Sequence, residues 1–402
     1  MQQNPNKIGL YIHIPFCDFM CHYCDFAKTA RWDQEIVNTY FKSLHSHLSY
    51  WLRYLQKNFK DFSFASINFG GGTPSLFSSE YAPLMELLRP YLQSQQEISI
   101  EANPKNCSPT NLSTWRSLGF NRISLGVQSF QRQGLDFLKR NHNPDQAIES
   151  CKKVGAYFDN FNIDLIYSWP EQSLSMWMQD LQQAISLKAN HLSLYNLTYA
   201  EKTPIGRAYL RGKIKELPDT EQVQFYNSAM SLLKKHNYIH EEVSNWSKET
   251  FSCIHNWLYW QGSYYLGIGT GAHSYLPSPN HHKGERFYYS RNLKHFKPIT
   301  STCKRAVPPQ ITEIAQHLPI FLDSRQADSW LLEMISCGLR THRGIDVSYL
   351  ELKSHTQFVP KNLVLEALES GLLFYENKRL CLQAQEWFRE TSWSLLVSEC
   401  FH

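Results

Sequence analysis

The stretch Tyr11-Ile-His-Ile-Pro-Phe-Cys17-Asp-Phe-Met-Cys21-His-Tyr-Cys24 places three cysteines in a C-x3-C-x2-C spacing, directly after a β-branched run. Thiolates are the usual protein ligands of iron–sulfur clusters, and this spacing lets three thiolates on one loop hold three irons. A cubane cluster has four irons, so one iron keeps a position open for an exchangeable ligand. We therefore predict a 4Fe-4S cluster on Cys17, Cys21 and Cys24.

Zinc is the first alternative for this triad, because His22 lies inside it and zinc accepts both Cys and His. A structural zinc site normally uses two separated ligand pairs, and no second pair follows at a suitable spacing. Plain packing of the thiols is the other alternative. The remaining cysteines are scattered, as is typical of reduced packing thiols: Cys107, Cys151, Cys253, Cys303, Cys337, Cys381 and Cys400.

Outward from the triad, the first half of the chain alternates between strand-like and helix-like segments. The expected strands are Ile8–Ile14, Phe64–Phe69, Glu97–Ala102, Arg122–Val127, Phe161–Ile166 and His191–Tyr195. The expected helices are Trp32–Lys57, Ser79–Tyr91, Pro109–Ser117, Pro144–Tyr157, Leu174–Leu187 and Asp219–His236. This alternation predicts an α/β fold with a parallel sheet, arranged as a partial (β/α)6 TIM-like barrel. Ligands of such folds bind at the carboxyl ends of the strands.

The chain of 402 residues exceeds the usual size of a single core, so we expect more than one domain. We predict a barrel over residues 1–240, with Tyr238–Val243 as an antiparallel strand. Residues 241–307 form an aromatic and glycine-rich extension that completes the site, with functional loops at 245–300. The linker Pro308-Pro309 opens a smaller helical, winged-helix-like domain over 308–402.

In that last domain we expect helices at Ser329–Gly338, Val347–Lys353, Leu363–Ser370 and Gln385–Ser398, and a wing from Leu372–Tyr375 and Arg379–Leu382. Winged helices often bind DNA, but no basic recognition helix is present here. The formal net charge is only +4, with no long basic run, so we expect no nucleic-acid partner. We interpret the domain as a lid or a docking surface.

The amino-terminal sequence lacks the basic and apolar regions of a signal peptide. No window approaches the ~18 uninterrupted apolar residues of a membrane span. We therefore expect a cytoplasmic protein without a membrane span.

The second motif, Phe69-Gly70-Gly71-Gly72-Thr73-Pro74, directly follows an expected strand. Glycines let the backbone approach a ligand closely and expose N–H groups. A phosphate loop is one alternative, but the Lys-Ser/Thr pair of that motif is missing. A tight strand-to-helix turn is the other.

Together these motifs resemble the radical SAM superfamily, and within it the group of oxygen-independent coproporphyrinogen III oxidases, over roughly the whole chain from Tyr11. The resemblance implies that Gly71, Gly72 and Thr73 contact the methionine part of S-adenosylmethionine. It also implies that Glu101, at the end of the third strand, pairs with the ammonium group of that cofactor.

Three further positions match residues that the family uses near the adenosyl ligand or a second one: Gln128, Arg140 and Asp164. A buried Asp at a strand end can equally be structural, for example as a helix cap. Tyr11 and Tyr23 flank the cluster, where we expect packing or a hydrogen bond near the cofactor. No residue is assigned a catalytic role.

The chemistry that the resemblance implies is reductive. An electron from a reductant such as flavodoxin or ferredoxin enters the cluster, and the sulfonium carbon–sulfur bond is cleaved. The resulting 5′-deoxyadenosyl radical abstracts hydrogen from a substrate. The protein supplies position, a dry cavity and tuning of the cluster.

The resembled group contains true oxidases and HemW-type haem chaperones, and three features favour the chaperones. Phe26 stands where the oxidase carries a fourth cysteine. Only ten residues precede Tyr11, too few for the long amino-terminal arm of the oxidase. The run His255-Asn-Trp-Leu-Tyr259-Trp260 matches an H-N-x-x-Y-W motif typical of the chaperones.

That last motif suits haem, because a neutral imidazole can be an axial iron ligand and the aromatic residues offer flat apolar surface. The alternative for His255 is a buried aromatic turn with a satisfied histidine. The run Gly267–Tyr275 also resembles the family, and we expect it to form a backbone loop near the cofactor.

Our first hypothesis is a haem chaperone that binds haem, a 4Fe-4S cluster and S-adenosylmethionine and transfers haem to an acceptor protein, which can be membrane-associated. The alternatives are an oxygen-independent coproporphyrinogen III oxidase and a radical SAM enzyme with another substrate.

Overall fold

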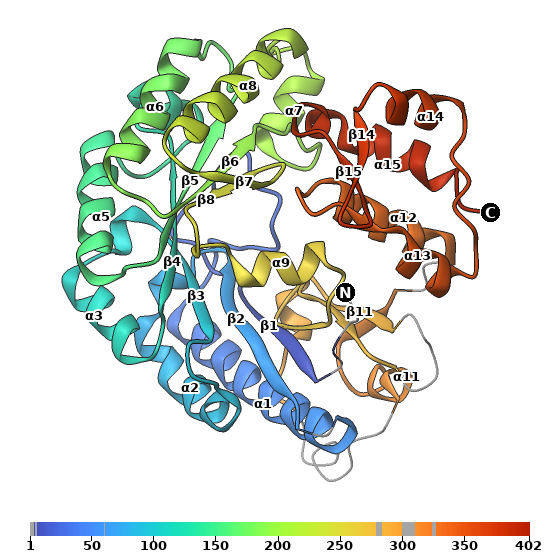
Figure 1. The fold of residues 1–402 in the computed structure, drawn as a ribbon. Coiled ribbons are helices and arrows are strands. Elements are labelled where there is room, and N and C mark those ends of the chain that lie inside the picture. The colour runs from blue at the N-terminus through green and yellow to red at the C-terminus, as the bar shows by residue number, and fades with distance from the viewer. Residues whose placement is uncertain (1–3, 5, 60, 279–283, 300–309, 324–326) are drawn as a thin grey trace.

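The computed structural model describes residues 4, 6–59, 61–278, 284–299, 310–323 and 327–402 (Figure 1). Its centre is a run of parallel strands that pair in chain order. These strands are β1 (Lys7–Ile14), β2 (Ser63–Gly71), β3 (Glu97–Ala102), β4 (Arg122–Gln128), β5 (Phe161–Tyr167) and β6 (His191–Asn196). All six expected strands are present, and the α/β partial-barrel fold is confirmed.

Helices cover the outer face of this curved sheet (Figure 1). They are α1 (Gln34–Asn58), α2 (Ala82–Leu88), α3 (Pro109–Ser117), α5 (Pro144–Tyr157), α6 (Leu174–Ser186) and α8 (Asp219–Lys235). The short helices α4 (Arg132–Phe137) and α7 (Pro204–Leu210) follow β4 and β6. Side-chain caps fix where several of them begin. Asp33 accepts the N–H of Ile36, and Asn143 forms a reciprocal capping box with Gln146. The helical connections between strands therefore begin at defined residues, and each next strand starts at the same end of the sheet.

The sheet extends at both sides of the parallel core to twelve strands. Beyond β6 come β8 (Asn245–Ser247) and β7 (Ile239–Glu242), which pair antiparallel. Beyond β1 come β9 (Tyr265–Ile268), β10 (His273–Leu276), β11 (Glu285–Tyr289) and β12 (Ile320–Leu322). Within the described residues the two outermost strands, β12 and β7, do not pair with each other, so the barrel is open.

These added strands correct the prediction that residues 245–300 are mainly loops. The strands are only three to five residues long, and glycines interrupt their pattern, so no alternation was visible. Their aromatic side chains pack into the main core, where Tyr275, Phe287 and Tyr289 are at most 1% exposed. The region also contains the helix α9 (Ile254–Trp260), and α11 (Ile311–Ile314) follows it.

The carboxyl-terminal part has a core of its own, made of residues from Trp330 to Phe401. Its helices are α12 (Ala327–Leu339), α13 (Val347–Ser354), α14 (Asn362–Glu369) and α15 (Glu390–Ser398). Its strands β13 (Ile345–Asp346), β15 (Arg379–Leu382) and β14 (Leu373–Glu376) form a small antiparallel sheet in that order. This is the expected helical, winged-helix-like domain.

The domain limits at 240 and 307 stay predictions. In the structure, β12 still belongs to the large sheet, and residues 300–309 around the expected linker lie outside the described residues. Among the described helices, none combines the length and the apolar character that crossing a bilayer requires.

Candidate functional site

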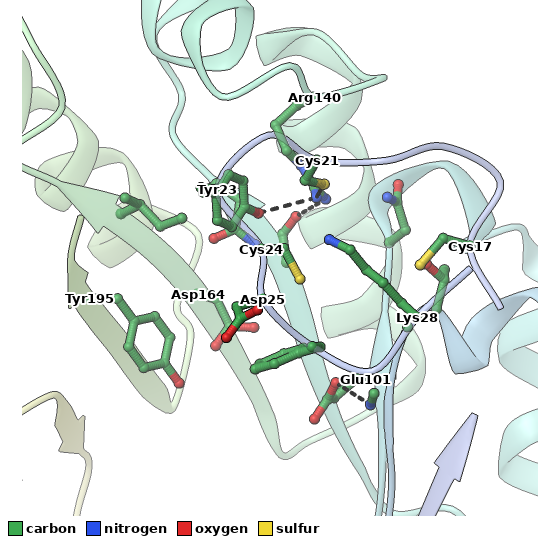
Figure 2. A pocket seen from close by; sticks show the side chains of 18 of the residues that line it. Cys17, Cys21, Tyr23, Cys24, Asp25, Lys28, Glu101, Arg140, Asp164 and Tyr195 are labelled. Atoms are coloured by element: carbon green, nitrogen blue, oxygen red, sulfur yellow. Dashed lines mark hydrogen bonds between the residues drawn. The ribbon is translucent and has the colours of Figure 1, made fainter. Parts of the chain in front are cut away.

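A cavity of about 430 Å³ opens at the carboxyl ends of the parallel strands (Figure 2). It brings together eleven of the predicted site residues from five strand ends and their loops: Cys17, Cys21, Tyr23, Cys24, Gly71, Gly72, Thr73, Glu101, Gln128, Arg140 and Asp164. Residues more than a hundred positions apart in the chain thus line one space. The rule that ligands bind at this edge of a parallel sheet agrees with the location.

The loop with the three cysteines directly follows β1 and is closed at its base. The Cys17 N–H donates to the carbonyl of Thr29 at 2.9 Å, and the Thr29 N–H donates to the carbonyl of Pro15 at 2.7 Å. The indole N–H of Trp32 donates to the carbonyl of Cys17 at 2.8 Å. The backbone at the first cysteine is therefore held from both sides.

All three cysteines of this loop are free thiols, with Cys17 buried and Cys21 and Cys24 partly buried. Burial raises the pKa of Cys17 to about 11. Binding iron would remove that proton, because a thiolate is the ligand form. Among the described residues, no three His, Cys, Asp or Glu side chains lie close enough to share one metal ion. A cluster makes a different demand, since each of its irons takes one thiolate.

Arg140, which follows α4, contacts the cysteine loop. Its Nη1 donates to Cys21 Sγ at 3.2 Å and to the hydroxyl of Tyr23 at 3.4 Å. Its Nη2 donates to the carbonyl of Gly126 in β4 at 2.8 Å. Arg140 therefore ties the second cysteine to the sheet.

The glycine run at the end of β2 is packed against the cluster loop. The N–H of Gly72 donates to the carbonyl of Ile14 at 2.7 Å, and the N–H of Thr73 donates to the carbonyl of Phe16 at 2.8 Å. Gly71 has φ +114°, and a Cβ there would lie 2.6 Å from the ring of His13. Only glycine fits this contact and this conformation. The run thus seats the cysteine loop as well as lining the cavity.

Two partly buried carboxylates, Glu101 and Asp164, face the cavity, and the exposed Asp25 also belongs to its lining. Burial raises the pKa of Glu101 to about 7 and that of Asp164 to about 6, and the nearby Asp164 adds to the rise at Glu101. Glu101 Oε2 accepts the N–H of Gly71 at 3.1 Å. Asp164 accepts from Asn162 Nδ2 at 2.7 Å and from the hydroxyl of Ser124 at 3.2 Å. Neither carboxylate has an ion-pair partner among the described residues.

Gln128 ends β4 in a strained conformation. Its φ is +71°, and the pairing of β4 with β5 shifts register between Gly126 and Gln128. A residue other than glycine in this region costs free energy, and such residues cluster at functional sites. The shift places the Gln128 side chain in the cavity wall.

The cavity lining also contains residues that were not predicted as site residues, among them Lys28, Ser124, Tyr195 and Leu197. Tyr195 and Leu197 follow from the position of the sixth strand, because its carboxyl end must reach the same edge. In Figure 2, Lys28 extends from the cluster loop toward the cysteines, and its charge lowers the pKa of Cys17 against the larger effect of burial. A single lysine near a triad carries no signal of its own in the sequence.

Tyr11 lies below the cavity rather than in its wall. Its hydroxyl is 3.0 Å from His13 Nδ1, and His13 Nε2 is 2.7 Å from the carbonyl of Ala27 in the cysteine loop. Because a carbonyl only accepts, Nε2 carries the proton of His13 and Nδ1 accepts from Tyr11. Burial lowers the pKa of His13 to about 4, so the ring is neutral. Tyr11 thus supports the cluster loop through His13.

The Gly267–Tyr275 run, which we expected to be a backbone loop near the cofactor, belongs partly to β9 and β10, and the turn between these strands lies beside the cysteine loop. A Cβ at Gly269, where φ is +114°, would lie 2.6 Å from the carbonyl of His13. A Cβ at Gly271 would lie 2.7 Å from Cβ of Ala27. The Tyr40 hydroxyl donates to the carbonyl of His13 at 2.8 Å. The run supports the cysteine loop from below.

His255, which we predicted as a haem ligand, is not among the residues that line this cavity; its ring centre lies 6.4 Å from that of Tyr11. It is 2% exposed and sits in α9 at the amino ends of the parallel strands. Its Nδ1 is 2.7 Å from the hydroxyl of Ser66, and its Nε2 is 2.8 Å from the hydroxyl of Tyr259. Both ring nitrogens therefore take part in hydrogen bonds. This matches the alternative considered above, a buried histidine with satisfied ring nitrogens.

Comparison with known proteins gives one family and one fold. Residues 11–184 match the model of the Radical SAM superfamily. The haem chaperone HemW of Lactococcus lactis is 31% identical over 388 residues, which cover 94% of this chain and 94% of that protein. HemW of Escherichia coli is 36% identical over 281 residues, covering 68% and 71% of the two chains.

Among solved structures, coproporphyrinogen III oxidase from Escherichia coli, a radical SAM enzyme, superposes with a TM-score of 0.74. The superposition covers 99% of this chain and 91% of that one, at 20% sequence identity. At this identity the match establishes the fold, which includes the carboxyl-terminal domain.

Proposed function

The chain belongs to the HemW family of haem chaperones, and we propose that it holds a 4Fe-4S cluster with S-adenosylmethionine and carries haem to an acceptor protein. One observation carries the cofactor part of this proposal. Three cysteines face a single cavity together with the carboxylates of Glu101 and Asp164, neither of which forms an ion pair among the described residues. S-adenosylmethionine has a sulfonium and an ammonium group, so it supplies a cation with which these carboxylates can pair.

In this proposal Cys17, Cys21 and Cys24 hold the cluster and leave one iron for the cofactor. Arg140 keeps Cys21 oriented through its 3.2 Å contact with Sγ. Glu101 takes the ammonium group of the cofactor. When bound and reduced, the cluster supplies the electron that cleaves the sulfonium bond.

The cavity mouth suits a porphyrin. Phe19, Phe26 and Leu197 line the cavity together with Tyr195, and Phe26 is 63% exposed. An exposed aromatic side chain at a ligand cavity is a feature of recognition sites. Lys28 adds a cation that a propionate group of haem can use. We place haem at this mouth, next to the cofactor.

The residue at position 26 argues against oxidase activity. Phe26 stands where the resembled oxidase carries a fourth cysteine, and here its ring is part of the cavity lining. The sulfur chemistry that a cysteine offers is therefore missing at this point. Whether the cofactor is cleaved during haem transfer is a separate matter, and the intact triad is compatible with cleavage.

The partners follow from this chemistry. Reduction of the cluster requires a low-potential electron carrier such as flavodoxin or ferredoxin. Delivery of haem requires a haem-accepting protein, which can be membrane-associated. The nine described cysteines are all free, and free thiols with an exposed cluster loop suit a reducing compartment. We therefore place the protein in the cytoplasm.

Haem titration of the anaerobically reconstituted protein tests this proposal. The Phe26→Ala variant should weaken haem binding, because it removes the exposed ring at the cavity mouth. The control is Phe321→Ala on β12, whose ring is 48% exposed but outside the cavity. Equal affinities for both variants would place haem elsewhere on the protein.

A further inference from the structure

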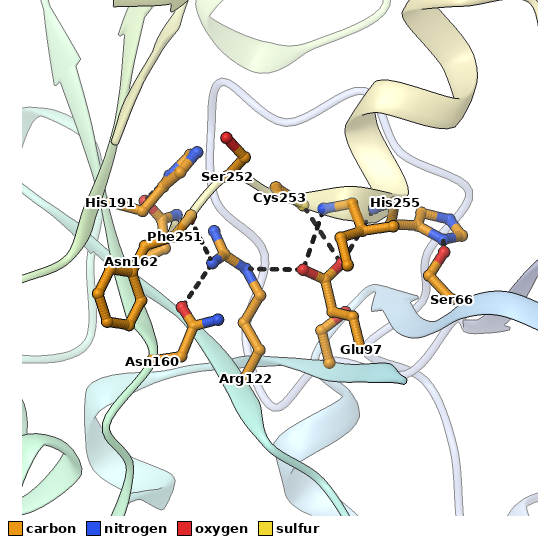
Figure 3. A network of polar contacts seen from close by, with 12 residues as sticks. Ser66, Glu97, Arg122, Asn160, Asn162, His191, Phe251, Ser252, Cys253 and His255 are labelled. Carbon is orange, nitrogen blue, oxygen red and sulfur yellow. Dashed lines mark hydrogen bonds and ion pairs between the residues drawn. The ribbon is translucent and has the colours of Figure 1, made fainter. Parts of the chain in front are cut away.

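The helix α9 lies at the opposite end of the parallel strands from the cysteine cavity, next to the carboxyl-terminal domain (Figure 1). A buried carboxylate anchors its first turn. Glu97, the first residue of β3, accepts the N–H groups of Ile254 and His255 at 3.0 Å each (Figure 3). Arg122, the first residue of β4, lies 4.0 Å from the same carboxylate. The helix is therefore fixed across the floor of the barrel.

One face of α9 points into the barrel floor. His255 bridges the hydroxyl of Ser66 in β2 and the hydroxyl of Tyr259 one turn later in α9. Leu258 packs so closely on β1 that a Cβ at Gly9 would lie 2.7 Å from its Cδ1. The pKa of His255 is lowered to about 3 by burial, so its ring is neutral. This face is filled and hydrogen-bonded.

The other face of α9 meets the segment 340–343, which follows α12. The guanidinium of Arg343 lies 4.0 Å from the ring centre of Trp257, and that of Arg340 lies 4.0 Å from the ring of Trp260. The ring of His342 meets Trp257 edge-on at 5.4 Å. The quadrupole of an indole ring attracts a cation that lies over its face, and the attraction is strongest where water is excluded.

Segment 340–343 is also bound to the edge of the large sheet. The Val243 N–H donates to the carbonyl of Arg340 at 3.0 Å, and the His342 N–H donates to the carbonyl of Glu241 at 3.1 Å. Arg340 Nη2 is 2.7 Å from Glu242, whose side chain is 2% exposed. The segment is thus held between α9 and the β7–β8 edge.

These contacts account for every named side chain of the H-N-x-x-Y-W motif except Asn256. His255 and Tyr259 face the barrel, while Trp257 and Trp260 face the carboxyl-terminal domain. Iron coordination by His255 would require breaking its bond to Ser66 or Tyr259 and admitting haem into the filled floor.

We propose that residues 254–260 form a clasp that fastens the carboxyl-terminal domain to the barrel floor, and that His255 is a positioning residue of this clasp rather than the haem-iron ligand. The second half of this statement rests on the proposed function, because it concerns where haem binds. The first half stands on the contacts of α9 alone. A clasp of this kind makes the orientation of the carboxyl-terminal domain depend on the packing of α9.

Hydrogen exchange of the full chain, read by mass spectrometry, tests the clasp. Arg343→Ala should speed exchange in 254–260 and 340–343 by roughly two- to fivefold, the effect of one cation–aromatic contact. Trp257→Ala should do the same or more, and the double variant should add little to Trp257→Ala. Trp257→Phe keeps an aromatic face and should restore most of the protection. Arg132→Ala, a surface variant on α4, is the control.

Additive effects of Arg343→Ala and Trp257→Ala, or unchanged exchange in both segments, would overturn the clasp.

The statement that His255 is not the haem-iron ligand is tested by the Soret band, which reports the axial ligand. His255→Gln and Trp257→Phe should both keep the band position and haem affinity of the wild type. A band lost in His255→Gln alone, with Trp257→Phe unchanged, would make His255 the iron ligand. A wild-type protein without any haem band would instead refute the proposed function and leave the exchange result valid.

Discussion

The affinity for S-adenosylmethionine should rise with pH, because the carboxylates that face the cavity must ionise before they attract a cation. Burial holds the pKa of Glu101 at about 7. With that pKa, the ionised fraction of Glu101 grows roughly 25-fold between pH 5.5 and pH 7.5, and the affinity should grow by up to this factor. Asp164, with a pKa of about 6, steepens the lower part of the curve.

The folding stability of the cofactor-free protein should change with pH in the opposite direction to the affinity. An acid whose pKa is higher in the folded state binds more protons there than in the unfolded state. Between the ordinary pKa of Glu, about 4.3, and the raised value of about 7, the cofactor-free protein should therefore lose stability as the pH rises. Bound S-adenosylmethionine should cancel this loss, since it pairs with the ionised form.

Equilibrium binding measured by calorimetry on the reconstituted protein checks this prediction. The range stops at pH 7.5, below the ordinary α-amino pKa of about 7.7–8.0, so that most of the ligand keeps a protonated amino group. Iron and sulfide contents are measured at each pH to separate ligand binding from cluster loss. Glu101→Gln should bind weakly at all values and lose most of the pH dependence. An affinity that falls with pH, or a Glu101→Gln variant with the wild-type profile, refutes the role given to this carboxylate.

Further predictions concern the cluster loop. Arg140→Met should keep the fold but lower cluster retention during desalting, because Cys21 loses its hydrogen-bond donor at 3.2 Å; iron content after reconstitution measures this. Gly71→Ala should lower the free energy of unfolding by about 1–3 kcal/mol in chemical denaturation, because a Cβ there meets the ring of His13 at φ +114°. Phe26→Cys should not confer porphyrinogen decarboxylation, since one thiol leaves the rest of the cavity wall unchanged; product analysis by chromatography decides this.

Much of the cavity followed from the sequence because its residues stand at fixed places relative to strands. The cysteine triad and the glycine run stand at the ends of recognisable strands, and parallel strands bring their carboxyl ends to one edge. The resemblance to a known family then added Glu101, Gln128, Arg140 and Asp164, which local patterns alone do not mark.

Other parts could not be predicted because their signals depend on contacts between distant segments. Strands β9 to β12 are short and aromatic, and the pairing of β9 with β1 and of the others in series beyond it is visible only in three dimensions. The direction of His255 is likewise set by Ser66 and by the cap from Glu97. A motif rich in His and Trp reads as a haem site in the sequence, while the structure gives the same side chains two packing faces.

The central claim is tested most directly by a haem-transfer assay run beside a decarboxylation assay on one preparation. The anaerobically reconstituted protein is loaded with haem, mixed with an apo-haem protein as acceptor, and followed by the acceptor's own Soret band. In parallel, it receives coproporphyrinogen III, reductant and S-adenosylmethionine. The account predicts transfer of haem to the acceptor and no decarboxylated porphyrinogen. Decarboxylated product over many turnovers, with no haem transfer, would contradict it and identify an oxidase.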